Sequence, residues 1–512
     1  MTEREGSQRE RALSECEGSQ RDRGTGRLVG ELGPRTRRVV YGDLGPAEIA
    51  AELPPMLRVD RAHVVMLAER GLIPRAAARD LLGAIRGLEA ERFAPLESRP
   101  APRGLYLMYE GWLIERLGAD VGGVLHTGRS RNDLKATVTA LWFREWVLEF
   151  AEQAVRLEAV LLSRARAYSS VVMPVYTHFQ AAMPVTYGWY LLGVARAVGR
   201  DVEALRAAAD GLRICPLGAG AVAGTDLPID PARTARLLGF DGPAPHALDA
   251  VASRDVPLRL LAAAAGLAVT LSRLATDLQL WSTAEFGLLH VPDRLVGGSS
   301  AMPQKRNAFL LEHVKAQHAH AVGAWAAAAA ATAGTPFTNS IEVGTEAVAA
   351  VRPGLAAAER AVLLSQVLVS GVRPVPDRMR ERAETGFTAA TAIANRLVRR
   401  GMPFRTAHSL VGDAVRRAVE AGSTTLSEFG PPGWLDGVGL TDLDLAALVR
   451  EQAYGGGPGA FAEPYGEAVG GWDAHRRWHR DWRAAVARAE AELAAAVDAV
   501  EAGGAGGRVG PR

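Results

Sequence analysis

The sequence contains few cysteines and no segment typical of export or membrane insertion. Only Cys16 and Cys215 occur among 512 residues, too few for a disulfide framework, so a reducing compartment is expected. The first residues, MTEREGSQRERALSECEGSQRDRG, lack the apolar core of a secretory signal. Apolar runs such as 260–271 are shorter than the roughly 18 residues of a membrane-spanning helix. The sequence therefore predicts a soluble, cytoplasmic protein with no membrane partner.

An excess of one charge is also missing. Lys and Arg number 59 against 57 Asp and Glu, a net charge of +2, and the basic residues are scattered. This balance argues against nucleic acid as a partner. The sequence has no phosphate loop of the GxxxxGK type, no dinucleotide fingerprint and no GxSxG elbow. His475 and His479 in HRRWH have no acidic third ligand at a suitable spacing. We expect no metal site and no organic cofactor.

What the sequence does contain is helical periodicity between two polar, Gly-rich tails, residues 1–38 and 501–512, which we expect to be disordered. Long helices are predicted over 133–167, 257–290 and 308–333. Long helices of similar length favour an all-α bundle. The alanine-rich third helix suits the middle of a bundle or an oligomer core. Alternatively, the alanines reflect only the high alanine content of the whole sequence.

Three polar loops beside these helices could carry chemistry, because loops on a rigid scaffold often do. HTGRSRND, residues 126–133, places arginines and backbone N–H groups at a helix start, where they could bind a carboxylate or simply cap the helix with solvated arginines. MPVYTHFQAAMPVTYG, 173–188, carries a histidine that could be a general acid or a surface residue. VGGSSAMPQKRN, 296–307, is either a ligand-wrapping loop or a basic surface turn.

Together these loops resemble the signature regions of the aspartase/fumarase superfamily, and of argininosuccinate lyases in particular. GGSSAMPQKRN is similar to the superfamily's GSSxMPxKxN loop, HTGRSRND to HTxRSRND, and YTHFQAAMPVTYG to YTHLQxAQPVTFG. The likeness covers roughly residues 56–415 in the same order. It implies a β-elimination that splits a C–N bond and releases fumarate, and homotetramers whose sites combine loops from three subunits. It also implies three helical domains, expected at 39–124, 125–372 with the central long-helix bundle, and 373–500.

The resemblance also assigns roles to individual residues. Ser299 would be the base, with Ser300 as the neighbouring alternative, and His178 would serve the acid side, oriented by Glu312. Lys305 would stabilise the carboxylate that becomes negative, because positioned cations and N–H groups favour charge that develops in the transition state. The expected contacts to substrate are Arg131, Asn132, Thr177, Asn307, Ser300 and Gln304.

The sequence departs from the argininosuccinate lyase pattern mainly on the amine side. A segment typically similar to LPLAYNRDLQEDKE reads TPFTNSIEVGTEAV here, so the family's Tyr, Gln and Lys fall on Asn339, Gly344 and Ala347. Tyr106 stands where a DEDIHM-like motif has His, and Ala308 replaces a proline. These changes predict a leaving amine other than arginine. The alternatives are a true argininosuccinate lyase and, in another class, a catalytically silent structural relative.

Overall fold

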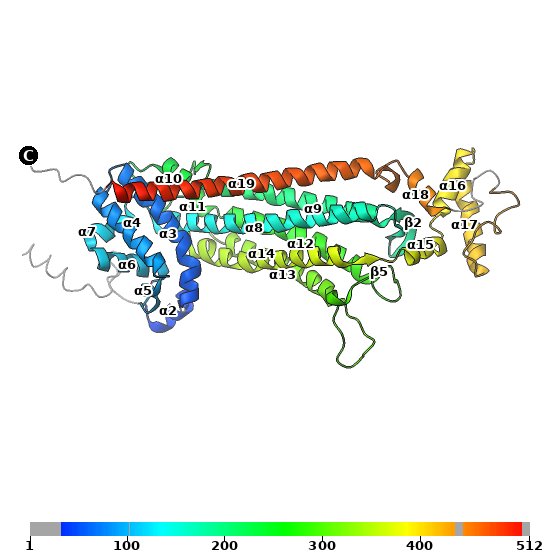
Figure 1. Cartoon of the computed structure of the whole chain (residues 1–512), viewed down its shortest axis with the longest axis horizontal. Coiled ribbons are helices and arrows are strands. Elements are labelled where there is room, and N and C mark those ends of the chain that lie inside the picture. Colours follow the sequence, from blue (N-terminus) through cyan, green and yellow to red (C-terminus); the bar gives the residue numbers. More distant parts are fainter. Residues whose placement is uncertain (1–31, 43, 102, 436–443, 504–512) are drawn as a thin grey trace, which may run out of the picture. The chain divides into compact units, whose positions relative to one another are not determined.

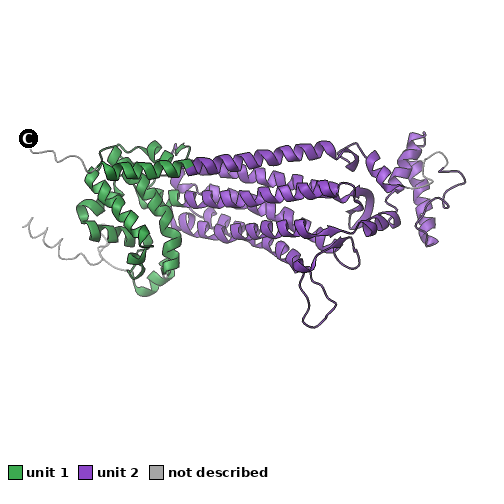
Figure 2. Cartoon of the chain, in the orientation of Figure 1, with its two compact units in different colours: residues 1–138, 216–243, 488–512 green, residues 139–215, 244–487 purple. Residues whose placement is uncertain are grey.

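The computed structural model describes residues 32–42, 44–101, 103–435 and 444–503. The described chain is predominantly helical, which confirms the predicted all-α class. It divides into two compact units, shown in Figure 2: the first contains 1–138, 216–243 and 488–512, and the second contains 139–215 and 244–487. The division into three domains stays a prediction. The expected N-terminal tail is too long, because helix α2 already begins at Pro34, whereas residues 1–31 lie outside the described residues.

The first unit is organised around α3 (Pro46–Glu69), which packs on α4 (Arg75–Ala90). The Gly45 N–H donates to the Glu48 carboxylate, which stabilises the start of α3 by satisfying a backbone donor that has no helical partner. Leu53 and Leu57 of α3 are buried against its neighbours. The remaining elements of this unit are α2 (Pro34–Tyr41), α5 (Ala94–Glu97), α6 (Leu105–Leu117), α7 (Ala119–Gly122), the 3-10 helix η1 (Gly123–His126), α10 (Pro231–Leu237) and the short strand β4 (Gly242–Pro243).

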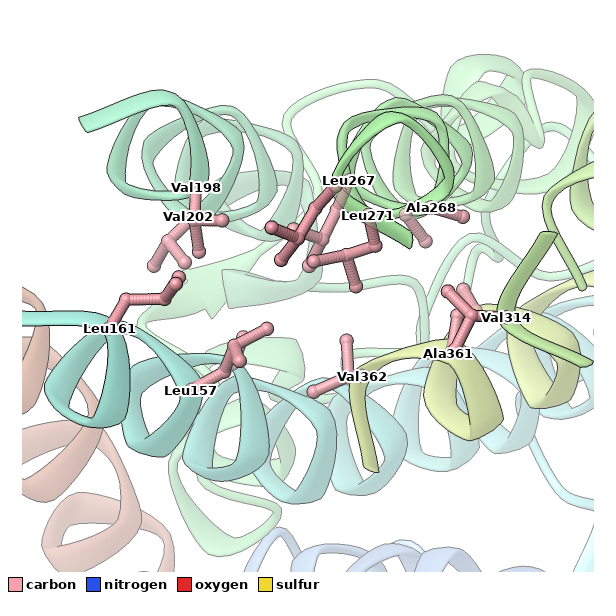
Figure 3. Packing of buried hydrophobic residues seen from close by; sticks show 14 of the residues in the cluster. Leu157, Leu161, Val198, Val202, Leu267, Ala268, Leu271, Val314, Ala361 and Val362 are labelled. Atoms are coloured by element: carbon pink, nitrogen blue, oxygen red, sulfur yellow. The ribbon is translucent and has the colours of Figure 1, made fainter. Parts of the chain in front are cut away.

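The second unit is a bundle of long helices that lie side by side in Figure 1: α8 (Arg131–Ala167), α9 (Tyr187–Ala209), α12 (Asp255–Trp281), α13 (Phe309–Ala333) and α14 (Ala347–Gly371). In Figure 3, Leu157 of α8 faces the core together with Val198 of α9, Leu271 of α12 and Val362 of α14. Each fully buried side chain of this size contributes about 1.5–3 kcal/mol to folding. The bundle is therefore a rigid support for the loops at its ends.

The three predicted long helices all exist, and α12 is shorter than expected. It ends at Trp281 rather than near 290, with Ser282 as its C-cap, and the chain turns at Gly287, whose φ is 65°, before strand β5 (Leu289–His290). By length and composition α12 could cross a membrane, with a mean hydropathy of 1.5 over its most apolar window. More than half of that window, 56%, is buried inside the protein, as in the core helix of a bundle.

The rest of the second unit consists of a hairpin, small helices and part of the last helix. Strands β1 (Val172–Thr177) and β2 (Gln180–Thr186) pair antiparallel. Helix α19 (Ala462–Ala502) contributes to both units. A small separate apolar core joins α16 (Ala390–Arg399) and α17 (Phe404–Glu420). The other elements are η2 (Asp210–Arg213), β3 (Ile214–Cys215), α11 (Ala247–Ala252), η3 (Asp293–Leu295), the π-helix η4 (Glu342–Glu346), β6 (Arg373–Pro374), α15 (Pro376–Thr385), α18 (Leu445–Glu451) and η5 (Pro458–Ala460).

Candidate active site

The GGSS loop is closed at its base by two backbone hydrogen bonds. The Gly297 N–H donates to the Asn307 carbonyl oxygen over 2.9 Å, and the Asn307 N–H donates back to Gly297 over 2.8 Å. The Asn307 side chain adds a bond from Nδ2 to the Gly298 carbonyl at 3.3 Å. Arg306, next to Asn307 at the end of the loop, is anchored by hydrogen bonds from its guanidinium to the Asp293 carboxylate and the Val291 carbonyl. The loop therefore has a fixed base, and its tip carries Ser299 to Lys305.

Ser299 lies where backbone donors converge on its hydroxyl. The N–H groups of Met302 and Ala301 donate to Ser299 Oγ over 3.1 and 3.3 Å. Two donors aimed at one oxygen stabilise negative charge on it, as an oxyanion hole does. Ser299 is half-buried, whereas Ser300, Gln304 and Lys305 are exposed. Of the two candidate serines, Ser299 has the surroundings that a base requires.

Glu312, near the start of α13, is held by the end of α12. Gln279 Nε2 donates to Glu312 Oε1 over 3.2 Å, and Lys315 Nζ donates to Gln279 Oε1 over 2.5 Å. In the described part of the chain no hydrogen bond joins Glu312 to His178. The expected orientation of His178 by Glu312 therefore stays a prediction for this chain.

Thr177 and His178 lie at the tip of the β1–β2 hairpin. Thr177 pairs with Gln180, so His178 and Phe179 form a two-residue turn, and both have positive φ, 52° and 60°. Hairpins favour this left-handed backbone, but non-glycine residues adopt it at a cost. The side chains of Thr177 and His178 are exposed, and in the hairpin stem Tyr176 contacts the ring of Trp281 at the end of α12. The turn presents the histidine at a fixed point.

Arg131 and Asn132 form the first turn of α8, in the first unit. Ser130 caps this helix: its Oγ accepts from the Asn132 N–H at 3.2 Å, while Asp133 Oδ1 accepts from the Ser130 N–H at 3.0 Å. Asp133 Oδ2 also accepts from the N–H groups of Gly218 and Gly220. Arg131 is exposed and free to meet an anion, and Asn132 is half-buried. The cap is thus Ser130, rather than Asn132 or Asp133.

The sequence reasoning missed the residues behind this turn. Arg129, which the capped-helix interpretation placed in solvent, is buried, and its Nη1 lies 2.6 Å from Asp60 Oδ1. Its Nη2 donates to the Tyr106 hydroxyl over 2.9 Å. Burial alone would lower the pKa of Arg129, but Asp60 and Tyr106 outweigh it and raise that pKa above its usual value. The only signal in the sequence for this buried ion pair was Asp60, a single aspartate on an apolar helical face.

The two histidines of the HRRWH segment are engaged in packing within the second unit. His475 Nδ1 lies 3.0 Å from Glu158 Oε2, and His479 Nε2 lies 2.8 Å from the Leu148 carbonyl. Both partners belong to α8. Among the described residues, no group of three or more His, Cys, Asp or Glu side chains is arranged to hold a metal ion.

Known proteins are similar to this chain over most of its length. A family model described as "Lyase" matches residues 107–323, and one described as "Argininosuccinate lyase C-terminal" matches 387–431. An argininosuccinate lyase from Methanoculleus marisnigri is 38% identical over 361 residues, which cover 70% of this chain and 73% of the relative.

Solved structures extend the similarity to nearly the whole chain. An EDDS lyase variant with bound fumarate superimposes with a TM-score of 0.79 at 26% identity, covering 93% of this chain and 97% of the other. A class II fumarase from Schistosoma mansoni shares the fold, with a TM-score of 0.62 at 17% identity over 77% of this chain and 92% of the other. The chain therefore belongs to the argininosuccinate lyase-like group of the aspartase/fumarase superfamily and is a carbon–nitrogen lyase that releases fumarate.

Proposed function

We propose that this enzyme cleaves N-substituted aspartates by β-elimination, with Ser299 as the base and an amine other than arginine as the leaving group. The observation that carries the proposal is the environment of Ser299, whose Oγ accepts two backbone hydrogen bonds within a loop closed at its base. Those donors favour the alkoxide form that a catalytic base must reach.

In this mechanism Ser299 takes the proton from the carbon next to the substrate carboxylate. The electrons move into that carboxylate, and Lys305 and Asn307 stabilise the dianionic intermediate. His178 donates a proton to the nitrogen as the C–N bond breaks, so fumarate and a neutral amine leave. Thr177, Ser300 and Gln304 would contact the substrate, and Arg131 and Asn132 would bind the fumarate portion. The reverse reaction, addition of an amine to fumarate, uses the same groups.

The segment 335–348 supports a different amine. Gly344 and Ala347 are buried, and Asn339 folds over Gly344, with its Oδ1 3.2 Å from where a Cβ would stand. Phe337 and Ile341 are instead exposed, by 64% and 66%. At the positions where argininosuccinate lyases carry Tyr, Gln and Lys, this chain therefore has side chains that are short or folded inward, and the neighbouring exposed side chains are apolar. A site built around polar contacts loses a cognate substrate by orders of magnitude when those contacts go.

The second candidate is argininosuccinate lyase itself, favoured by the name of the relative that is 38% identical. The EDDS lyase likeness over 93% of the chain favours the main proposal instead. A catalytically silent relative is the least favoured, because Ser299, Lys305, His178 and Glu312 are all present. We further propose a cytoplasmic homotetramer in which several subunits share each site.

The test follows fumarate by its ultraviolet absorbance, with argininosuccinate and a panel of N-substituted aspartates as substrates. We expect turnover of another N-substituted aspartate in preference to argininosuccinate. Ser299→Ala should lower kcat by about 100-fold or more, the usual contribution of a general base, whereas Ser300→Ala, which removes only a contact to the substrate, should have a smaller effect. Preferred turnover of argininosuccinate would establish the second candidate, and a loss confined to Ser300→Ala would move the base by one residue.

A further inference from the structure

Behind the first turn of α8, a continuous row of polar side chains crosses the interior of the first unit. Asp60 contacts Arg129, Arg129 Nη2 donates to the Tyr106 hydroxyl, and that hydroxyl lies 3.1 Å from His126 Nδ1. His126 Nδ1 in turn lies 3.6 Å from Glu110 Oε1. The inner members are buried, whereas His126 and Glu110 are half-buried. The row therefore runs from the core of the unit toward its surface.

Charge fixes one hydrogen bond of the row, because the Arg129 guanidinium can only donate to the Tyr106 hydroxyl. Burial, and then Arg129 and Arg131, lower the pKa of His126 to about 4, so the ring is neutral near pH 7. A neutral imidazole accepts a hydrogen bond at one ring nitrogen and donates one at the other. The Tyr106 hydroxyl therefore accepts from Arg129 and lies within hydrogen-bond distance of His126 Nδ1, and it also bonds to the Glu110 carboxylate. Among the described residues, this hydroxyl joins Arg129 to His126 and Glu110. A phenylalanine in its place could make none of these contacts.

The row is tied to the backbone that precedes Arg131. His63 Nε2 lies 2.8 Å from the Thr127 carbonyl, and Gly128 has a φ of +71° with Ile229 Cγ2 only 2.8 Å from where a Cβ would stand. Residues 126–129 thus form a tight turn that is held by His126 and Arg129 from the inside. Arg131 follows two residues later, and Asn132 Nδ2 donates to the Ala221 carbonyl.

From this geometry we infer that Tyr106 is a positioning residue for dicarboxylate binding: by joining Arg129 to His126 it sets the backbone that presents Arg131 and Asn132 to the anion. The inference rests on the proposed function insofar as Arg131 and Asn132 bind the fumarate portion. Tyr106 itself does not touch the substrate in this account.

The experiment measures fumarate binding to the purified full-length enzyme by calorimetry, so the result does not depend on turnover. For Tyr106→Phe we expect the Kd of fumarate to rise about tenfold, which corresponds to about 1.4 kcal/mol. In turnover assays the loss should appear in KM, with kcat nearly unchanged.

Tyr190→Phe is the matched control, because it removes another buried phenol hydrogen bond, from Tyr190 to Asp277 Oδ2 at 2.7 Å in the second unit. It should lower the Tm without changing the Kd of fumarate. If Tyr106→Phe does not fold, His126→Leu interrupts the same row at a half-buried position and should weaken binding in the same direction. A parental Kd in a folded Tyr106→Phe or His126→Leu variant would overturn the inference. Fumarate binding that depends on Tyr106 without any C–N cleavage would contradict only the proposed function.

Discussion

At the scale of single residues, His126 determines how the first unit responds to acid. Its pKa lies near 4 because of burial and then Arg129 and Arg131, whereas an unfolded histidine titrates near pH 6.5. Between those values the unfolded chain binds a proton that the folded one does not. The stability associated with this neutral ring is therefore fully present above about pH 6.5 and is lost as the pH falls toward 4.

We therefore expect the Tm of His126→Gln to fall less than the Tm of the parent protein as the pH is lowered from about 6.5 to 4.5, since glutamine does not titrate. Thermal unfolding at a series of pH values measures the difference. The slope should not vanish, because burial also lowers the pKa of His63 well below its usual value. His408→Gln, at an exposed position of α17, is the control and should follow the parent. Identical slopes for all three proteins would contradict this account of His126.

At the scale of elements, side chains on one face of α19 bind α8 through hydrogen bonds from their ring nitrogens. Trp472 Nε1 donates to the Val155 carbonyl over 3.1 Å, one turn before the contact of His475 with Glu158. Glu158 is only 3% exposed, and a Cβ on Gly199 would stand 2.9 Å from its Oε1. Glycine at 199 thus leaves room for a buried carboxylate, and His475 is the partner that this carboxylate needs.

Replacing His475 with Leu should therefore destabilise the second unit by about 1.5–3 kcal/mol, because the buried Glu158 loses a hydrogen-bond partner. Urea unfolding followed by circular dichroism measures the effect. A second change, Glu158→Leu, should recover much of the loss in the double variant, because no buried polar group is then left without a partner. His408→Leu serves as the control at an exposed site. A double variant that is less stable than His475→Leu would show that packing, not charge, links the two helices.

Elements with a local signal could be predicted from the sequence. The α8 and α13 helices begin within two residues of the predicted positions because apolar spacing marks them. The β1–β2 hairpin was expected only as a polar loop, because no alternating apolar pattern marks its two strands. In the fold, Tyr176 of this hairpin packs against Trp281 and Phe286. Arg129 could not be assigned to the interior, since Asp60 lies 69 positions earlier in the sequence and no local pattern connects them. The roles of the residues of the GGSS loop stay predictions from resemblance, and the donors to Ser299 Oγ follow only from the fold.

At the scale of the whole molecule, one copy of the chain leaves an apolar helix largely uncovered. Of the 25 residues of α13 only Leu311, Val314, Ala321 and Ala328 are buried, although the helix is rich in alanine. Val322 and Trp325 on α13 are 43% and 41% exposed. Its bundle neighbours add Val269 of α12 and Val367 of α14 to the exposed large hydrophobic residues. Large exposed apolar patches in soluble proteins usually mark interfaces, which supports the proposed homotetramer.

Val322→Asp should then break the assembly and abolish activity in the same step, because a buried unpaired carboxylate is not tolerated in an interface and the shared sites would be lost. Sedimentation velocity, with fumarate release measured on the same samples across a dilution series, tests both consequences. Val419→Asp is the matched control, since Val419 is 60% exposed on α17, away from the bundle helices. The control should keep the parental mass and rate. A Val322→Asp protein that sediments as a folded monomer and retains full activity would mean that each chain completes its own site, and the proposal of shared sites would then fail even if the parent is a tetramer.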